Sequence, residues 1–361
     1  MRELAPRLLE WAAAGDAYAV ASVVTVTGSA PRRPGAALAV HADGTVVGSV
    51  SGGCVEGAVY ELAQEALATG TPELARFGYS DEDAFAAGLT CGGALDVFVQ
   101  PVLPATRTAE TLTAAHHAVS TGNPVALARI VSGPLRGGTV AWTAETPYGT
   151  TGDPVLDAAL LADARTRLRS GRTALHSYPT AGHATQALIE PWPPPARLLV
   201  FGSTDYAASI AALGTFLGHH VTVCDARAVF TTRERFPTAD ELVVDWPHRY
   251  LATTPTDDRT AICVTTHDPK FDIPLLTEAL RRPAAYIGAL GSRRVHTDRL
   301  RLLTEAGLTP AELHRLHSPI GLDIGANTPE ETAVAIAAEL IAARGEVSCR
   351  PLSRVGVPIH R

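Results

Sequence analysis

Five short apolar runs in the second half of the chain alternate with helical patterns, and this rhythm restricts the fold more than any other feature of the sequence. The runs are Leu198–Phe201, Val221–Cys224, Leu242–Val244, Ala261–Val264 and Ala285–Ile287. Short strands that alternate with helices are typical of βα units around a parallel sheet. We therefore expect an α/β C-terminal domain with a Rossmann-like, doubly wound parallel sheet. Its last helix is expected to begin at Thr328-Pro329-Glu330-Glu331, a capping box with proline at the first helical position.

The first half of the chain mixes helical and strand patterns. Leu4, Leu8 and Trp11 form one helical stripe that ends at Gly15, and Asp43-Gly44 between two apolar runs predicts a hairpin. The other elements we expect are a strand over Val20–Val26, a helix from Val55 to about Gly70, a strand over Leu95–Val99, a helix over Ala109–Val119 and a strand over Val125–Val131. These patterns predict a mixed α/β N-terminal domain.

A proline-rich run, Pro191-Trp192-Pro193-Pro194-Pro195, lies between the two patterns. Prolines at this density do not sustain a helix or a central strand, so the run is the expected linker. We predict an N-terminal domain over residues 1–190, a linker over 191–196, a C-terminal domain over 197–345 and a tail over 346–361.

Composition and charge narrow the class of protein. The chain has 361 residues, of which 46% are hydrophobic, enough for two domains with their own cores. It shows no signal-peptide pattern and no apolar run near the roughly 18 residues of a membrane span, which predicts a soluble, cytoplasmic protein. A net charge of −7 with scattered basic residues argues against nucleic-acid binding. Five cysteines, an odd number, argue against a disulfide framework.

Cys54 follows Gly52 and Gly53 where a glycine-rich turn enters a helix. The helix dipole and the free amides of the two glycines are expected to favour its thiolate form, which suits a nucleophile or a soft metal ligand. The second run, Cys91-Gly92-Gly93, would complete one anion-binding hollow with two thiols. The alternative is that each cysteine is a small buried residue at a turn, and neither has the near Cys or His partner of a zinc motif.

The turn after Phe201 has part of a dinucleotide-binding pattern. Gly202 suits the tight turn, and Asp225 lies at the end of the next strand, where an acidic residue binds a ribose. Thr204, however, takes the place of the second glycine, where a β-branched side chain obstructs a pyrophosphate. NAD(P) binding therefore stays open, with a scaffold domain as the alternative.

Two later loops follow predicted strands at the edge where α/β sheets bind ligands. His267-Asp268 offers a general acid or base, or a histidine that simply hydrogen-bonds to its neighbour. Gly291-Ser292-Arg293-Arg294 combines a flexible turn, a helix start and two guanidinium groups, which suits a phosphate or pterin phosphate. The alternative for the arginine pair is a solvated surface.

Six motifs in order resemble the XdhC/CoxI family over nearly the whole chain. In the N-terminal half they are Gly28-Ser29-Ala30-Pro31-Arg32, Gly52-Gly53-Cys54-Val55-Glu56-Gly57 and Thr90-Cys91-Gly92-Gly93. In the C-terminal half they are His267-Asp268, Gly288-Ala289-Leu290-Gly291-Ser292-Arg293-Arg294, and Pro319-Ile320-Gly321-Leu322-Asp323-Ile324-Gly325 with Thr328-Pro329-Glu330-Glu331.

The resemblance implies an accessory protein that binds molybdenum cofactor (molybdopterin), protects it during sulfuration and delivers it to a xanthine-dehydrogenase-type molybdenum hydroxylase. It implies that Cys54 and Cys91 contact the cofactor and its metal, and that a hydroxylase and a cysteine desulfurase are partners. Homodimer formation stays open.

The resemblance has two exceptions, at Thr204 in the Rossmann turn and at Val295, where relatives often carry a basic residue. They leave a second hypothesis, an NAD(P)-dependent oxidoreductase that uses Asp225, His267 and a cleft between the domains. Whether the chain is an enzyme or a chaperone without turnover is therefore undecided at this point.

Overall fold

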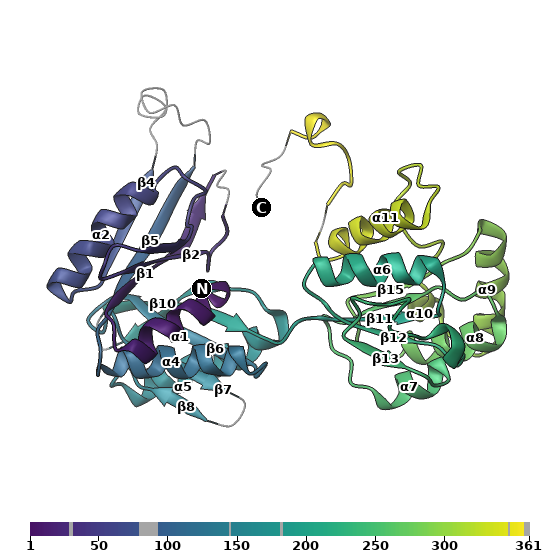
Figure 1. Cartoon of the computed structure of the whole chain (residues 1–361), viewed down its shortest axis with the longest axis horizontal. Helices are drawn as coiled ribbons and strands as arrows, with labels where there is room; N and C mark the ends of the chain where they lie inside the picture. Colours follow the sequence, from purple (N-terminus) through teal and green to yellow (C-terminus); the bar gives the residue numbers. More distant parts are fainter. Residues whose placement is uncertain (29–31, 79–92, 144–145, 181–182, 346, 357–361) are drawn as a thin grey trace. The chain divides into compact units, whose positions relative to one another are not determined.

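The computed structural model describes residues 1–28, 32–78, 93–143, 146–180, 183–345 and 347–356. They form two compact units, Met1–Pro194 with the segment from Pro351, and Pro195–Arg350 (Figure 1). The division at Pro194 falls inside the run expected to be a linker. Each unit is described by itself.

The second unit contains a six-stranded parallel sheet. Its strands are β11 (Arg197–Phe201), β12 (His220–Cys224), β13 (Glu241–Val243), β14 (Ala261–Val264), β15 (Tyr286–Ala289) and β16 (Leu316–His317). They are ordered β13-β12-β11-β14-β15-β16, so the chain winds outward from β11 in one direction and then returns to wind in the other. This order is that of a doubly wound Rossmann sheet and confirms the expected fold class.

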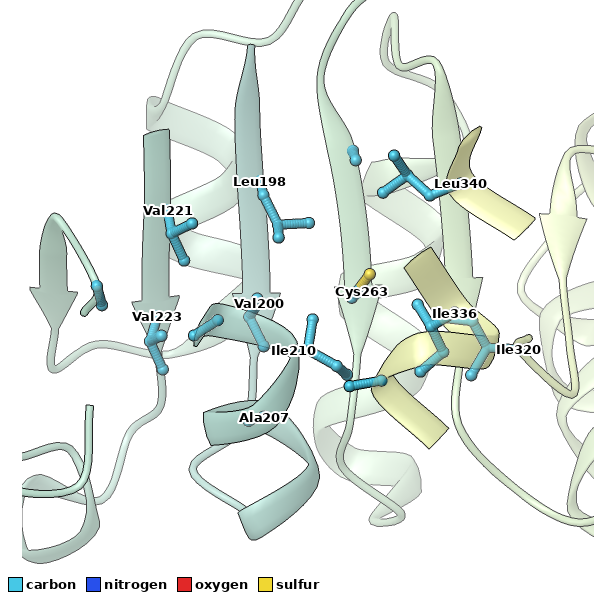
Figure 2. Close-up of a cluster of buried hydrophobic side chains, with 14 of the residues drawn as sticks. Leu198, Val200, Ala207, Ile210, Val221, Val223, Cys263, Ile320, Ile336 and Leu340 are labelled. Atoms are coloured by element: carbon cyan, nitrogen blue, oxygen red, sulfur yellow. The ribbon is translucent and has the colours of Figure 1, made fainter. Parts of the chain in front are cut away.

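Helices cover both faces of this sheet. On one face lie α6 (Asp205–Phe216) and α11 (Pro329–Ala342), and on the other lie α7 (Pro247–Thr253), α8 (Pro269–Ala279) and α9 (Arg293–Glu305). Successive strand residues alternate between the faces: Leu198 and Val200 pack against α6 and α11, whereas Leu199 packs on the opposite side. Figure 2 shows the first of these cores. Two short helical segments, η2 (Ala228–Phe230) and α10 (Pro310–Leu313), lie in the connections.

The first unit contains two antiparallel sheets. The first is ordered β3 (Val46–Gly48), β2 (Ala37–His41), β1 (Tyr18–Thr27), β5 (Ala94–Val102) and β4 (Glu73–Gly78), and α2 (Glu56–Thr69) packs on it. The second is ordered β8 (Pro147–Gly149), β7 (Thr139–Thr143), β6 (Val125–Ser132), β10 (His183–Trp192) and β9 (Ala174–Thr180), and α5 (Pro154–Ser170) packs on it.

Two further helices, α1 (Ala5–Ala14) and α4 (Arg107–Ser120), join the two sheets into one unit. Their buried side chains share a core with Tyr18 and Val20 of the first sheet and with Leu127 and Trp192 of the second. The first unit is therefore a mixed α/β domain, as expected. The short helices η1 (Arg2–Leu4) and η3 (Leu352–Arg354) lie near the chain ends.

The expected linker begins too early. Pro191 and Trp192 belong to β10 and pair with Ala126 and Val125 of β6. β9 pairs with β10 only as far as Ile189, so β10 has a single neighbouring strand at Pro191. Proline is tolerated at such an edge because a missing amide there breaks no ladder on the open side. The proline density alone did not reveal this.

Within the described residues, no helix has both the length and the apolar character needed to cross a membrane.

Candidate functional site

The carboxyl ends of four neighbouring strands bring the predicted C-terminal site residues to one edge of the sheet. Gly202, Asp225, His267 and Gly291 follow β11, β12, β14 and β15, which lie side by side in the order β12-β11-β14-β15. The amide of Gly202 donates to the carbonyl of Cys224 at 2.9 Å. A Cβ at position 202 would lie 2.6 Å from Oγ1 of Thr265, and φ is +113°, so this turn requires glycine.

Asp225, expected to bind a ribose, is held by its own chain. Its carboxylate accepts hydrogen bonds from the Ser203 amide at 2.8 Å and from Nε and Nη2 of Arg227 at 2.9 and 2.7 Å. Burial raises the pKa of Asp225, but the hydrogen bonds from Arg227 and Ser203 outweigh burial and leave the pKa below its ordinary value. Both oxygens are engaged, so the geometry gives no support to NAD(P) binding.

Thr204 has a structural role at the position of the missing glycine. It is the N-cap of α6, and its hydroxyl accepts a hydrogen bond from the Ala207 amide at 3.1 Å. Capping by threonine satisfies one of the amides that would otherwise face a bound phosphate. The departure from the glycine pattern thus stabilises the helix at the place where a pyrophosphate would approach.

Two exposed arginines follow the loop after β15, at the start of α9. Ser292 caps α9 by accepting from the Val295 amide at 3.3 Å, and Arg293 and Arg294 follow in the first helical turn. Both arginines are exposed, and within the described residues neither guanidinium has a hydrogen-bond or ion-pair partner. Two exposed guanidinium groups at the start of a helix suit an anion such as a phosphate.

His267 and Asp268 do not form a pair in the part of the chain that the structure describes. Asp268 is the N-cap of α8 and accepts from the Lys270 amide at 3.0 Å, while its second oxygen lies 3.3 Å from Nζ of Lys270. His267 is exposed beside it. Asp268 therefore serves as a helix cap, and any acid or base chemistry of His267 remains a prediction.

A buried ion pair that the sequence analysis did not predict connects α8 and α9, the helices that follow β14 and β15. Nη2 of Arg299 lies 3.0 Å from Oδ2 of Asp272, and the two side chains are 3% and 4% exposed. Arg299 also donates to the Leu290 carbonyl and to Oγ of Ser318, each at 3.0 Å. Since Arg299 lies four residues before buried Leu303 on α9, an arginine on the apolar stripe of the helix was the available signal.

The loop that carries Cys54 in the first unit is folded around a carboxylate of its own. Glu56, in the first turn of α2, accepts hydrogen bonds from the amides of Ser51, Gly52 and Gly53 at 2.9, 3.0 and 2.8 Å. The hydroxyls of Ser49 and Ser51 donate to it at 2.7 and 2.5 Å. Burial raises the pKa of Glu56, but these hydrogen bonds outweigh it and lower the pKa to about 2.

The contacts of Glu56 contradict the prediction that Gly52 and Gly53 form a hollow for a bound anion. The amides of Gly52 and Gly53 are not free to stabilise a thiolate or a bound anion, because they already bind Glu56. The Cys54 amide instead donates to Oγ of Ser51 at 2.9 Å, and the residue is half-buried against the core under α2. An acidic residue three positions after a glycine pair, at a helix start, was the available signal in the sequence.

The remaining cysteines differ in accessibility. Cys224 and Cys263 are buried, and burial raises the pKa of each thiol to about 12. Cys349 is exposed. Cys91 and Gly92 lie outside the described residues, and Gly93 directly precedes β5. Among the described side chains, no three His, Cys, Asp or Glu groups stand close enough to hold a metal ion.

Comparison with known families finds matches in both units. A model described as the XdhC Rossmann domain matches residues 198–340, and one described as the XdhC and CoxI family matches residues 11–78. The first match covers the parallel sheet and its helices, and the second includes the Cys54 loop.

Known proteins resemble the chain over nearly its full length. A Bacillus subtilis protein, named as a probable subunit of xanthine dehydrogenase, is 28% identical over 91% of this chain and 94% of its own. The Escherichia coli molybdenum cofactor insertion chaperone PaoD is 26% identical over 94% of this chain and 88% of its own. A crystal structure described as a xanthine dehydrogenase from Bacillus halodurans superimposes with a TM-score of 0.69 at 26% identity and covers 98% of both chains.

Proposed function

Because this chain belongs to the XdhC and CoxI family, we propose that it is an accessory protein for inserting molybdenum cofactor into a xanthine-dehydrogenase-type molybdenum hydroxylase. It acts as a chaperone, without turnover of a substrate. The relatives that support this role resemble both units of the chain, so the proposal concerns the whole protein.

The observation that carries the proposal is the fixed presentation of Cys54. Its thiol belongs to a loop whose amides and hydroxyls donate to Glu56, so contacts within the chain stabilise the loop. A thiol is a soft donor that suits a metal already carrying sulfur ligands. Cys54 is therefore the proposed contact for the metal end of the cofactor, and Cys91 is proposed as its companion.

Within the second unit, taken by itself, the proposed phosphate-binding group is the pair Arg293 and Arg294. Both guanidinium groups are exposed and unpaired within the described residues, and Ser292 fixes the start of their helix. Planar guanidinium groups bind phosphate oxygens through paired, charge-assisted hydrogen bonds. Each of the two contacts is testable without the other.

Two further partners belong to the proposal. A cysteine desulfurase would supply the sulfur of the terminal sulfido ligand, and a second copy of the chain would form a homodimer. Co-purification with the desulfurase and analytical ultracentrifugation of the isolated chain test these two points.

Retention of cofactor after gel filtration tests the function. Purified protein is incubated with molybdenum cofactor, separated, and assayed for bound molybdenum. We expect retention by the wild type and by Cys349→Ser, which removes an exposed thiol elsewhere, and loss with Cys54→Ser or Cys91→Ser. Arg293→Ala with Arg294→Ala should weaken retention. If the wild type retains no molybdenum, the proposal is wrong.

A further inference from the structure

A cavity of about 900 Å³ lies in the first unit, away from the Cys54 loop. One face of α4 forms its base, the C-terminal end of α1 forms one side, and residues of β7 and β8 form another. Its volume is at the upper end of the range for small-molecule sites, roughly 300–1,000 Å³. None of the motifs behind the proposed function falls here.

The base of the cavity is a regular stripe along α4. Glu110, Ala114, His117 and Thr121 follow one another at intervals of three or four residues, so they share one face of the helix. From Glu110 to Thr121 this stripe is about 16 Å long. Ala114 has the smallest side chain of the four and lies in the middle of the stripe.

The charge of the lining has one sign. Glu110 and Asp16 line the cavity, and none of its described lining residues is lysine or arginine. Asp16 is already 3.2 Å from Nε2 of His41, whereas Glu110 has no ion-pair or hydrogen-bond partner for its carboxylate in the described part of the chain. Within the described residues, exposed Glu110 is thus the unpaired anion of this site, and its charge disfavours phosphate or carboxylate ligands.

Apolar and hydroxyl groups complete the lining. Val102 and Ala118 provide buried carbon surface, and Tyr148 provides an exposed ring. Tyr18 also belongs to the lining; it is 1% exposed, and its hydroxyl finds no hydrogen-bond partner within the described residues. A buried hydroxyl without a partner is unfavourable by about 1–3 kcal/mol, so a ligand that hydrogen-bonds to it gains affinity.

We propose that this cavity binds a small organic cation, a protonated amine on an aromatic or aliphatic body. The ammonium group pairs with the Glu110 carboxylate near the start of α4, and the apolar body packs on Val102, Ala114 and Tyr148. This ligand class differs in charge from the anionic molybdenum cofactor, so the site is separate from the proposed chaperone function.

Calorimetry with two matched probes on the full chain tests this inference. Tryptamine carries an ammonium group, and indole-3-propionate carries a carboxylate on the same ring and linker. We expect tryptamine to bind with one-to-one stoichiometry and indole-3-propionate to give no signal. Glu110→Gln should weaken tryptamine binding about fivefold, the upper range for an exposed ion pair. Ala114→Trp should abolish binding by filling the cavity.

Glu61→Gln is the matched control, since it removes an exposed carboxylate from α2 in the same unit without touching the cavity. Its affinity for tryptamine should equal that of the wild type. The inference is overturned if neither probe binds at millimolar concentration, if both bind equally, or if Glu110→Gln leaves the affinity unchanged. Binding of a lysine-rich peptide in place of tryptamine would overturn it too and identify a protein-docking groove. Should Ala114→Trp fail to fold, Glu110→Gln alone decides.

Discussion

The backbone amide of Gly53 donates a hydrogen bond to Oε2 of Glu56 at 2.8 Å, three residues ahead in the chain. Successive backbone amides in a turn form a concavity that binds an anion. Here the anion is part of the same chain, so the loop holds its shape in the absence of any ligand. The position of Cys54 therefore depends on Glu56.

Replacing Glu56 by glutamine should destabilise the first unit. The pKa of Glu56 is lowered to about 2, so its carboxylate stabilises the fold above the unfolded-state pKa of 4.5, and this contribution is lost as the pH falls from 4.5 through 2. Because water screens part of this loop, we expect Glu56→Gln to cost about 1–2 kcal/mol at pH 7. Urea unfolding at pH 7 measures the cost of the substitution, and unfolding at pH 3 measures how much of the carboxylate's contribution is lost in acid.

The exposed Glu61 on α2 supplies the control for that experiment. Glu61→Gln should change the free energy of unfolding by less than about 0.5 kcal/mol. Equal stability of Glu56→Gln and wild type at pH 7 would show that the loop does not depend on this carboxylate.

His116 should make the first unit sensitive to mild acid. It is fully buried, stacks on Trp192 at 5.6 Å, and has a pKa lowered to about 3 by burial and by the positive charges of the Met1 amino group and Arg129. The unfolded chain binds a proton near pH 6.5 while the folded chain does not, so stability falls as the pH drops below 6.5.

At pH 5 this difference amounts to about 2 kcal/mol for a group with these two pKa values. His116→Phe keeps a flat aromatic ring beside Trp192 and should remove that part of the stability loss between pH 7.5 and pH 5. Denaturant unfolding at the two pH values gives the comparison, with His117→Gln on the exposed side of α4 as control. An unchanged pH dependence in His116→Phe would refute the assignment.

The Asp272–Arg299 pair should show strong coupling. Arg299→Leu leaves the Asp272 carboxylate buried without its cation, which costs about 3–5 kcal/mol, whereas replacing both residues by leucine restores most of the loss. A double-mutant cycle from urea unfolding at pH 7 measures the coupling. Additive effects of the two substitutions would mean that the pair does not couple α8 to α9.

Thr204→Ala should weaken α6 without creating a dinucleotide site. The variant loses the hydroxyl that caps the Ala207 amide, at a cost of about 1 kcal/mol. Arg227 still holds Asp225, so calorimetry with NAD(H) and NADP(H) should remain silent at millimolar ligand. Thr297→Ala, on the exposed side of α9, is the stability control. Measurable NADH binding by the variant would contradict the role given to Arg227.

The sequence predicted the second unit well because its signals are local. Five of the six strands in the parallel sheet are short apolar runs, and the capping box at Thr328 and Glu331 is observed at the start of α11. The sixth, β16, has only two residues, and no pattern of that length identifies a strand. In the first unit, β7 and β8 were not predicted, since β7 is a strand through its pairing with β6 and β8 through its pairing with β7.

For the site, the sequence located the loops but not the destinations of their side chains. Strand ends placed Gly202, Asp225 and Gly291 at one edge of the sheet, which parallel pairing guarantees. In the structure, Arg227 binds Asp225 and Glu56 binds the glycine amides. Both contacts depend on the directions of side chains in the folded chain. Charge and spacing along the chain do not determine those directions.

Because β10 includes Pro191 and Trp192, a fragment made to study the first unit has to extend beyond residue 190. A fragment that stops at residue 190 would lose the last two rungs between β10 and β6, together with the indole ring on which His116 stacks. It would expose a buried imidazole and promote aggregation. A fragment that continues through Pro194 keeps the whole of β10 and the indole ring of Trp192, so His116 stays buried.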